Sequence, residues 1–511
     1  MSPSRGAPNL FVASVVAGFL LIGLVLIMLL GAVQGWSLLI AGVWGAMLIG
    51  RPKLLLFIYW CWITVSIYVQ SRFGNMLTIW GDEMLVGLMV GVLLTHHIRA
   101  RIFLPELKMV KRALMGLVGL IVLSALANRV PKLLAFHFAL QYMRFFLLVY
   151  YAYYFLSTKD LPTVLATIVW LFLLQVVLNV GWLFGINPLP NWMSGPDFAI
   201  GTGLGANLVG YYSVAVICIM IAYLRYSSRP WQKIGGVALL LVALFQLYIS
   251  FTFHAYLLCA LCVALQLYLP PRPVHERVMQ LGLASVAAVI LVIIASQFPA
   301  AESVQRFFHP DYLKFRWRNM VDGPKGQSYK NNFYYLPKEV PFFLVGAGAG
   351  NAGSMVGRMN RRPLADKYFN WVDLAIEAKS ISGSGSIAGG PMTGVLALWS
   401  ELGPIGLLLY WGLQVYAAVR VARAVRRGEY KNRYKQILAE AYPSVQMMLV
   451  AVNLLSDYCF LAFMNGGIWI WAACVWTPGD SDVSPSARLT DTEEPSDVWK
   501  KVREQRAEAL P

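Results

Sequence analysis

Charged side chains are scarce in this sequence. Asp, Glu, Lys and Arg make up only 13% of its 511 residues, whereas 58% are hydrophobic, and the mean hydropathy is +0.60. A soluble chain of this composition would lack the polar surface needed to cover its core. The composition therefore excludes a soluble globular protein and predicts an integral membrane protein.

The familiar motifs of metal and nucleotide chemistry are missing as well. The six cysteines fall inside apolar runs, and no zinc-ligand spacing or nucleophile elbow occurs. GAGAGN at 346–351 resembles a phosphate-binding loop in its glycine spacing, but no βαβ pattern surrounds it and no Lys-Ser or Lys-Thr follows. We interpret it as a turn that requires small residues, and we expect no cofactor and no bound metal.

Long apolar runs fill most of the chain. Because a transmembrane helix needs about 20 mainly apolar residues, these runs predict an all-α polytopic membrane protein with about 14 transmembrane helices. The predicted spans are 9–30, 33–50, 54–70, 77–95, 113–128, 133–156, 161–185, 205–224, 234–252, 254–269, 280–298, 393–419, 443–462 and 465–476.

Lys and Arg are divided unevenly between the loops. If both termini are cytoplasmic, the short outer loops hold only Arg72, Arg129 and Lys132, and most other basic residues fall in inner loops or in the long outer loop. An excess of Lys and Arg in short loops is typical of the cytoplasmic side. We therefore expect both termini inside, and we interpret most of the net charge of +17 as a topology signal rather than a nucleic-acid-binding surface.

One predicted outer loop is much longer than the others, and it is rich in both aromatic and basic residues, which predicts an ordered cap. The expected organisation is helices 1–11 in residues 1–298, the cap in 299–392, helices 12–14 in 393–476 and a cytoplasmic tail in 477–511.

Two groups of polar residues are candidates for a site. In the cap, FRWRNM carries Arg316 and Arg318, whose guanidinium groups suit phosphate oxygens; a solvated basic surface is the alternative. Inside predicted spans, Arg144, Asp82 and Glu83 would be costly to bury and therefore mark a candidate functional site; the alternative is that Arg144 simply pairs with Asp82. His254 follows a tight outer turn, where it is either functional or a buried, hydrogen-bonded histidine.

Several stretches together resemble one family. FTFHAYLLCALCV, then a large loop with FRWRNM and PFFLVGAGAGN, then WSELGPIGLLLYWGLQ resemble the O-antigen ligase and Wzy-type polysaccharide polymerase superfamily. TIWGDEMLVGLMV and GTGLGANLVGYYSV are similar to its earlier helices. The resemblance covers roughly residues 77 to 462.

The resemblance implies a GT-C-type architecture with a large periplasmic loop, and a metal-independent glycosyltransferase of the bacterial inner membrane. Such enzymes transfer glycan from an undecaprenyl-pyrophosphate carrier to an acceptor hydroxyl on the periplasmic side. Arg316, Arg318 and Arg144 would bind the diphosphate and stabilise the charge that develops on it. Asp82 and Glu401 would support the site.

The sequence departs from the ligase pattern at the expected base. Ligases carry a His-Asn pair shortly before the glutamate-leucine-glycine motif, and counting back from Glu401 places Met392 there. His254 occupies the place where the family usually has an arginine. The group that activates the acceptor stays open among His254, His309 and Glu339.

Without the ligase histidine, we expect a polymerase that joins lipid-linked repeat units of an exopolysaccharide or O-antigen. Its expected partners are the lipid-linked oligosaccharide and membrane lipids, with a chain-length regulator as a candidate and no nucleic acid. One alternative is a ligase that transfers glycan to lipid A core or protein. The other is a lipid-linked oligosaccharide flippase, which performs no chemistry.

Overall fold

The computed structural model describes eleven continuous ranges of the chain and three isolated residues. The predicted spans at 9–30, 33–50 and 280–298 lie outside the described residues. The described residues are 50–73, 76–100, 104–183, 205–250, 252–270, 275, 278, 282, 310–322, 324–354, 356–357, 360–369, 393–455 and 462–477.

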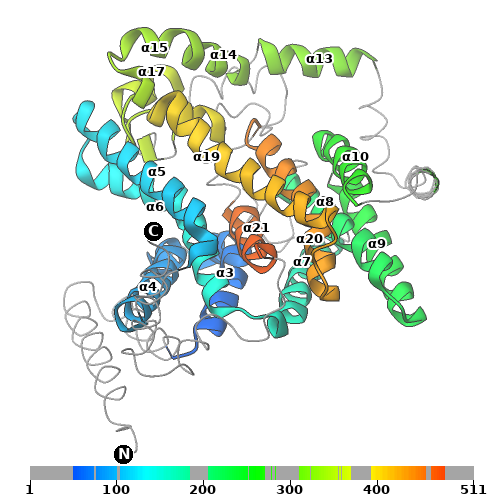
Figure 1. The fold of residues 1–511 in the computed structure, drawn as a ribbon. Helices are drawn as coiled ribbons and strands as arrows, with labels where there is room; N and C mark the ends of the chain where they lie inside the picture. Colours follow the sequence, from blue (N-terminus) through cyan, green and yellow to red (C-terminus); the bar gives the residue numbers. More distant parts are fainter. Residues whose placement is uncertain are drawn as a thin grey trace, which may run out of the picture.

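Every regular element within those ranges is a helix (Figure 1). Six helices of the described chain are long and apolar enough to cross a membrane, and three shorter apolar helices accompany them. This confirms the prediction of an all-α membrane protein. The helices of the bundle in the described ranges are α3 (Pro52–Phe73), α4 (Met76–Ala100), α5 (Lys108–Ala127), α6 (Lys132–Phe155), α7 (Leu161–Leu183), α8 (Gly205–Tyr226), α9 (Pro230–Ile249), α10 (Phe253–Tyr268), α19 (Gly394–Arg426), α20 (Arg433–Val452) and α21 (Ala462–Val475).

The helices expose large apolar side chains on the outside of the bundle. Leu126, Leu133, Trp170 and Leu408 are each at least 70% exposed. Exposed apolar side chains of this size would be unfavourable in water, whereas lipid tails solvate them at no cost. The surface therefore agrees with a bundle surrounded by lipid.

The predicted span at 443–462 is wrong, because it lies about half a helix too far along the chain. The helix there, α20, begins at Arg433 and ends at Val452, because the Asn432 side chain accepts hydrogen bonds from the amides of Tyr434 and Lys435 and caps its first turn. The polar first turns lower the hydropathy of this stretch, so the predicted helix begins too late in the chain.

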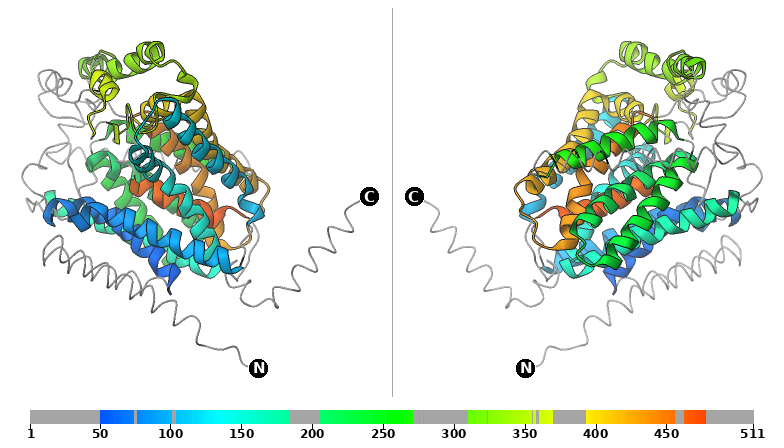
Figure 2. Two further views of the ribbon diagram at one scale, coloured as in Figure 1. Left: turned by 90° about the vertical axis from the view of Figure 1, so that its left-hand side faces the viewer. Right: turned by 90° about the vertical axis from the view of Figure 1, so that its right-hand side faces the viewer.

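The described helices pack against one another in one bundle (Figure 1). One end is covered by α13 (Pro310–Val321), α14 (Pro324–Lys330), the π-helical turn η4 (Asn331–Tyr335), α15 (Leu336–Glu339), η5 (Phe343–Val345) and α17 (Pro363–Phe369). These short elements, which we call the cap, lie across the top of the bundle in Figures 1 and 2. The cap is joined to the helices directly: the Tyr329 hydroxyl donates to the Leu454 carbonyl at 2.6 Å, and Phe333 stacks on Trp399.

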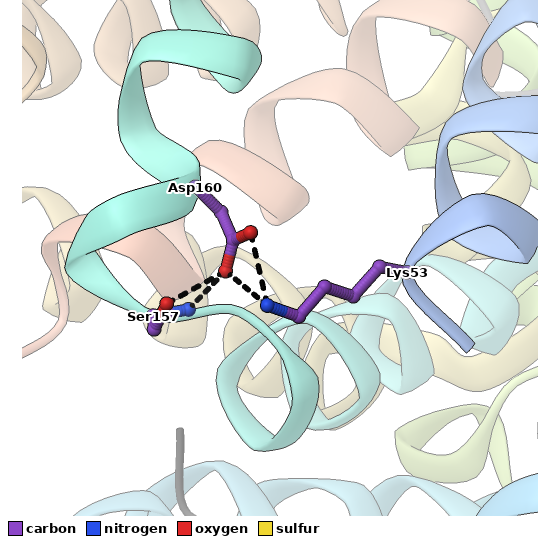
Figure 3. Close-up of polar contacts among 3 residues, drawn as sticks. All are labelled: Lys53, Ser157 and Asp160. Carbon is purple, nitrogen blue, oxygen red and sulfur yellow. Dashed lines mark hydrogen bonds and ion pairs between the residues drawn. The ribbon is translucent and has the colours of Figure 1, made fainter. Parts of the chain in front are cut away.

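The end opposite the cap, which we call the base, brings described parts of several predicted inner segments together: the Trp476 indole donates to the Glu106 carbonyl, and Arg420 donates to the Trp476 carbonyl. There, Lys53 at the start of α3 forms an ion pair with Asp160 at 2.7 Å (Figure 3). The same carboxylate accepts from the backbone amide and the hydroxyl of Ser157, each at 2.8 Å. Asp160 thereby closes the turn before α7 (capping box in η2, Thr158–Asp160) and ties it to α3.

Candidate functional site

The glycine loop, residues 346–354, docks on the first turns of α19. The Ala347 amide donates to the Ser400 carbonyl at 2.7 Å, and the Gly348 amide donates to the Glu401 carbonyl at 3.2 Å. Gly346, Gly348 and Gly350 all have positive φ angles, 78°, 104° and 82°. L-residues with a side chain rarely adopt this backbone conformation. The interpretation of GAGAGN as a turn that requires small residues is confirmed.

The Glu401 side chain fills the concave side of this loop. It is fully buried, and its carboxylate accepts hydrogen bonds from the backbone amides of Gly350, Ala352 at 3.2 Å and Ser354 at 2.8 Å. Backbone amides from alternate residues of the loop thus converge on one buried carboxyl group and satisfy its oxygens. Because this carboxyl group belongs to α19, the loop holds α19 and the cap together.

A break in α19 makes this approach possible. Gly403 has φ 67° and ψ −171°, which interrupts the helix before Pro404. A Cβ atom on Gly403 would lie 2.4 Å from the carbonyl oxygens of Phe343 and Leu344. Only glycine fits there. Because Gly403 has no side chain, the cap can contact the backbone of α19 at the kink.

The loop also orients an arginine. Asn351 accepts a hydrogen bond from Nε of Arg362 at 2.8 Å through its side-chain oxygen, and its amide nitrogen donates to the Ala347 carbonyl. The Arg362 side chain is half-buried. Its position is thus fixed through Asn351 to the glycine loop.

The basic residues of FRWRNM lie on α13, which is part of the cap (Figure 1). Lys314 and Arg318 are exposed, and Trp317 between them is 68% exposed. Arg316 lies on the same helix, and its side chain is outside the described part of the structure. The helix thus presents cationic and aromatic groups together, as the sequence predicts.

Glu339 lies on the exposed surface of the cap. It forms an ion pair with Lys367 of α17, and the hydrogen bond from that ammonium group lowers the pKa of the Glu339 carboxyl below its usual value. A carboxylate stabilised in this way is a weaker proton acceptor. These surroundings therefore do not favour its predicted role as the proton acceptor that activates the acceptor hydroxyl.

Arg144 on α6 is buried in an ion-pair cluster with two neighbouring residues of α4. Its guanidinium contacts Asp82 and, at 3.4 Å, Glu83. The pairing that the sequence analysis kept as an alternative thus exists. A diphosphate at Arg144 would have to compete with two carboxylates, so the predicted diphosphate role of this residue has no support from its surroundings.

His254 lies in the first turn of α10, at the cap end of the bundle. It is half-buried, and its ring packs against Tyr211 of α8 with centroids 5.4 Å apart. His309, the other predicted imidazole, lies outside the described residues. Among the described residues, no group of three or more His, Cys, Asp and Glu side chains could hold a metal ion.

The roles of Asn351 and Ser354 were not foreseen from the sequence. Both follow the glycines of GAGAGN within a few residues, and polar residues after a glycine run are common in turns. That signal indicates a turn, but it does not indicate which distant side chain the turn receives.

Comparison with known proteins does not identify a family: no family model and no curated protein matches this chain.

Proposed function

We propose that this protein is a polysaccharide polymerase of the Wzy type, with a GT-C-type architecture of about 14 transmembrane helices in a bacterial inner membrane. It would transfer glycan from an undecaprenyl-pyrophosphate carrier to the acceptor hydroxyl of another lipid-linked repeat unit. The base of the bundle would face the cytoplasm, because basic loops favour that side. The cap would then be periplasmic.

The observation that carries the proposal is the contact between two distant stretches named in the family resemblance. PFFLVGAGAGN and WSELGPIG lie about fifty residues apart. The Glu401 carboxylate accepts from the Gly350 amide, and the Ala347 and Gly348 amides donate to the carbonyls of Ser400 and Glu401. A cap fixed in this way can hold its arginines at a constant height above the membrane helices. Fixed cationic groups are the means by which a diphosphate leaving group is stabilised without reorganisation.

We assign the diphosphate to Arg318 and Arg316 of α13 rather than to Arg144, because Asp82 and Glu83 already balance the charge of Arg144. His254 is the favoured candidate for the group that activates the acceptor, since Glu339 is paired with Lys367. The test uses purified protein, lipid-linked repeat units and EDTA, with products separated by gel and identified by mass spectrometry. A ladder spaced by one repeat unit is expected.

Arg318→Ala should slow this polymerisation about a hundredfold, the usual effect of removing one preorganised contact to the developing charge. Arg318→Lys should restore only part of it, because Lys lacks the bidentate fork. Arg427→Ala, which removes an exposed arginine at the base, is the matched control and should leave the rate unchanged. Transfer to lipid A core instead would favour a ligase, and translocation without transfer would favour a flippase.

A further inference from the structure

Helices α10 and α19 each expose an apolar strip along one face. On α10, the exposed side chains Leu257, Leu261 and Tyr268 are spaced by four and seven residues, so they share one face of the helix. On α19, Val415 and Val419 are exposed and are spaced by four residues. Lipid tails solvate such faces, whereas water does not. Both helices therefore present surface to acyl chains.

Helix α20 lies between these two helices and packs against both. The Cys262 thiol of α10 donates to the Ser444 carbonyl at 3.4 Å, and the Gln446 side chain donates to Gln414 of α19 at 3.1 Å. Because an α-helix turns by about 100° per residue, Met447 lies on the face of α20 between these two contacts. Met447 is itself exposed, so it adds an apolar side chain between the strips of α10 and α19.

At the base, the two strips end at a stacked cation. The Arg426 guanidinium of α19 lies over the Tyr268 ring of α10, 4.7 Å from the ring centroid. Arg426 follows Val419 by seven residues and so continues the same face of α19. Arg423, one turn earlier, is also exposed. A guanidinium stacked on a ring keeps its N–H edge available for oxygen atoms.

These arginines are not needed to complete the end of α19. Basic side chains near a helix end can bind its last carbonyl groups, but the carbonyls of residues 423–425 already accept from the backbone amides of residues 427–429 at 3.0–3.1 Å. The acidic residue of this turn, Glu429, pairs with Arg427. Among the described residues, neither Arg423 nor Arg426 has a carboxylate partner. Their charge is therefore left for an anion from outside the chain.

The position of the arginines restricts that anion to a lipid. Val415 and Arg426 are about 11 residues apart, which is roughly 16 Å along a helix and about half of the hydrocarbon thickness of roughly 30 Å. The apolar strip below the arginines is thus about as deep as one leaflet. An acidic peptide or a nucleic acid would bind the arginines but leave this strip uncovered. A phospholipid carries the phosphate and the acyl chains in one molecule.

We propose that Arg423, Arg426 and Tyr268 form a headgroup site for an anionic phospholipid of the leaflet at the base. The phosphate accepts from the two guanidinium groups, and an acyl chain lies along α19 and Met447. A zwitterionic lipid carries its own cation and gains less from two arginines. The bound lipid contacts both α10 and α19, so it should stabilise their arrangement around α20. The site is at the opposite end of the bundle from α13 and would bind lipid whether or not the protein is a polymerase.

The test is native mass spectrometry of the delipidated full-length protein in detergent, which gives the dissociation constant of the first bound lipid. The probes are phosphatidylglycerol, phosphatidylcholine with the same acyl chains, and inorganic phosphate. Phosphatidylglycerol should bind at least about tenfold more tightly than phosphatidylcholine, since two arginines near a membrane surface each favour an anionic lipid by about fivefold. It should also raise the melting temperature. Inorganic phosphate should not displace it.

Arg423→Ala and Arg426→Ala should each weaken phosphatidylglycerol binding about fivefold and leave phosphatidylcholine binding unchanged. Tyr268→Leu should weaken it as well, because the ring that holds Arg426 is lost, whereas Tyr268→Phe keeps the ring and should bind normally.

Arg51→Ala is the matched control, because it removes an exposed arginine just before α3, at the same end of the bundle. It should bind phosphatidylglycerol as the unaltered protein does. An equal loss in Arg51→Ala and Arg426→Ala would mean that the positive charge of the whole base attracts lipid, and the local site would be refuted. Equal affinities for the two lipids, unchanged binding in both Arg423→Ala and Arg426→Ala, or displacement of the lipid by inorganic phosphate would refute it too.

Discussion

The contact of Glu401 with the glycine loop predicts that one side chain controls whether the cap stays on the bundle. In Glu401→Ala, the amides of Gly350, Ala352 and Ser354 lose their acceptor in a fully buried place. Each unsatisfied buried amide costs about 1–3 kcal/mol, so the docked loop should lose at least about 3 kcal/mol. Since about 1.4 kcal/mol corresponds to a factor of ten, the undocked population should rise at least about a hundredfold.

Limited proteolysis with trypsin measures this population directly. Arg361 and Arg362 follow the glycine loop, and Arg362 is tied to it through Asn351. An undocked loop frees the bond between Arg361 and Arg362, which is the bond that trypsin can cut here, because Pro363 protects the bond after Arg362. When opening is fast relative to cleavage, the cleavage rate follows the open population. Glu401→Ala should therefore be cut there about a hundredfold faster, and Glu401→Gln, which keeps one acceptor oxygen, should lie between it and the unaltered protein.

Glu429→Gln serves as the control for that experiment, because its carboxylate pairs with Arg427 at the base, far along the chain from the glycine loop. It should leave cleavage at the cap unchanged. If Glu401→Ala is cut in the cap at the same rate as the unaltered protein and melts at the same temperature, the carboxylate does not hold the loop and the reasoning fails.

Three other substitutions follow from the contacts. Gly403→Ala should reduce the melting temperature and the yield of folded protein, because its Cβ would lie 2.4 Å from backbone oxygens of the cap, whereas Ala at an open helical glycine should not. The lowered pKa of Glu339 means that its ion pair with Lys367 is complete above the ordinary pKa of about 4.3 and is lost as the pH falls through the lower folded value. Cleavage of the cap by pepsin, which is active at acidic pH, should therefore rise in that window. A pH-independent difference from Glu339→Gln would contradict the pairing. Lys53→Ala breaks the pair with Asp160, but Lys53 is exposed, so chemical denaturation should show a loss of less than about 1 kcal/mol.

Much of the helical architecture follows from the sequence alone. Runs of apolar residues set the position of most helices, because a segment in lipid must satisfy its backbone internally and stay apolar outside. The prediction erred at α20, where the helix begins in a polar stretch containing Arg433. Its guanidinium donates to Ser227 and Gln232, and a hydropathy window cannot register partners that come from the turn after α8 and from α9.

The candidate site was only partly accessible from the sequence. The residue types of FRWRNM and the burial cost of Arg144 and Asp82 indicated where to look, because charge and hydropathy are local properties. Whether each of these side chains is free to act depends on neighbours far along the chain. Arg144 is paired with two acidic side chains of another helix, and Glu339 is paired across the cap.

The sequence by itself determined that the chain is a helical membrane protein, which residues are apolar enough to face lipid, and that GAGAGN needs small residues. Only the tertiary structure decided which side chain the glycine loop receives and which acidic side chains contact Arg144. The reason is physical: hydropathy and backbone conformational freedom belong to single residues and short runs. Hydrogen-bond satisfaction depends on atoms that folding brings together from distant parts of the chain.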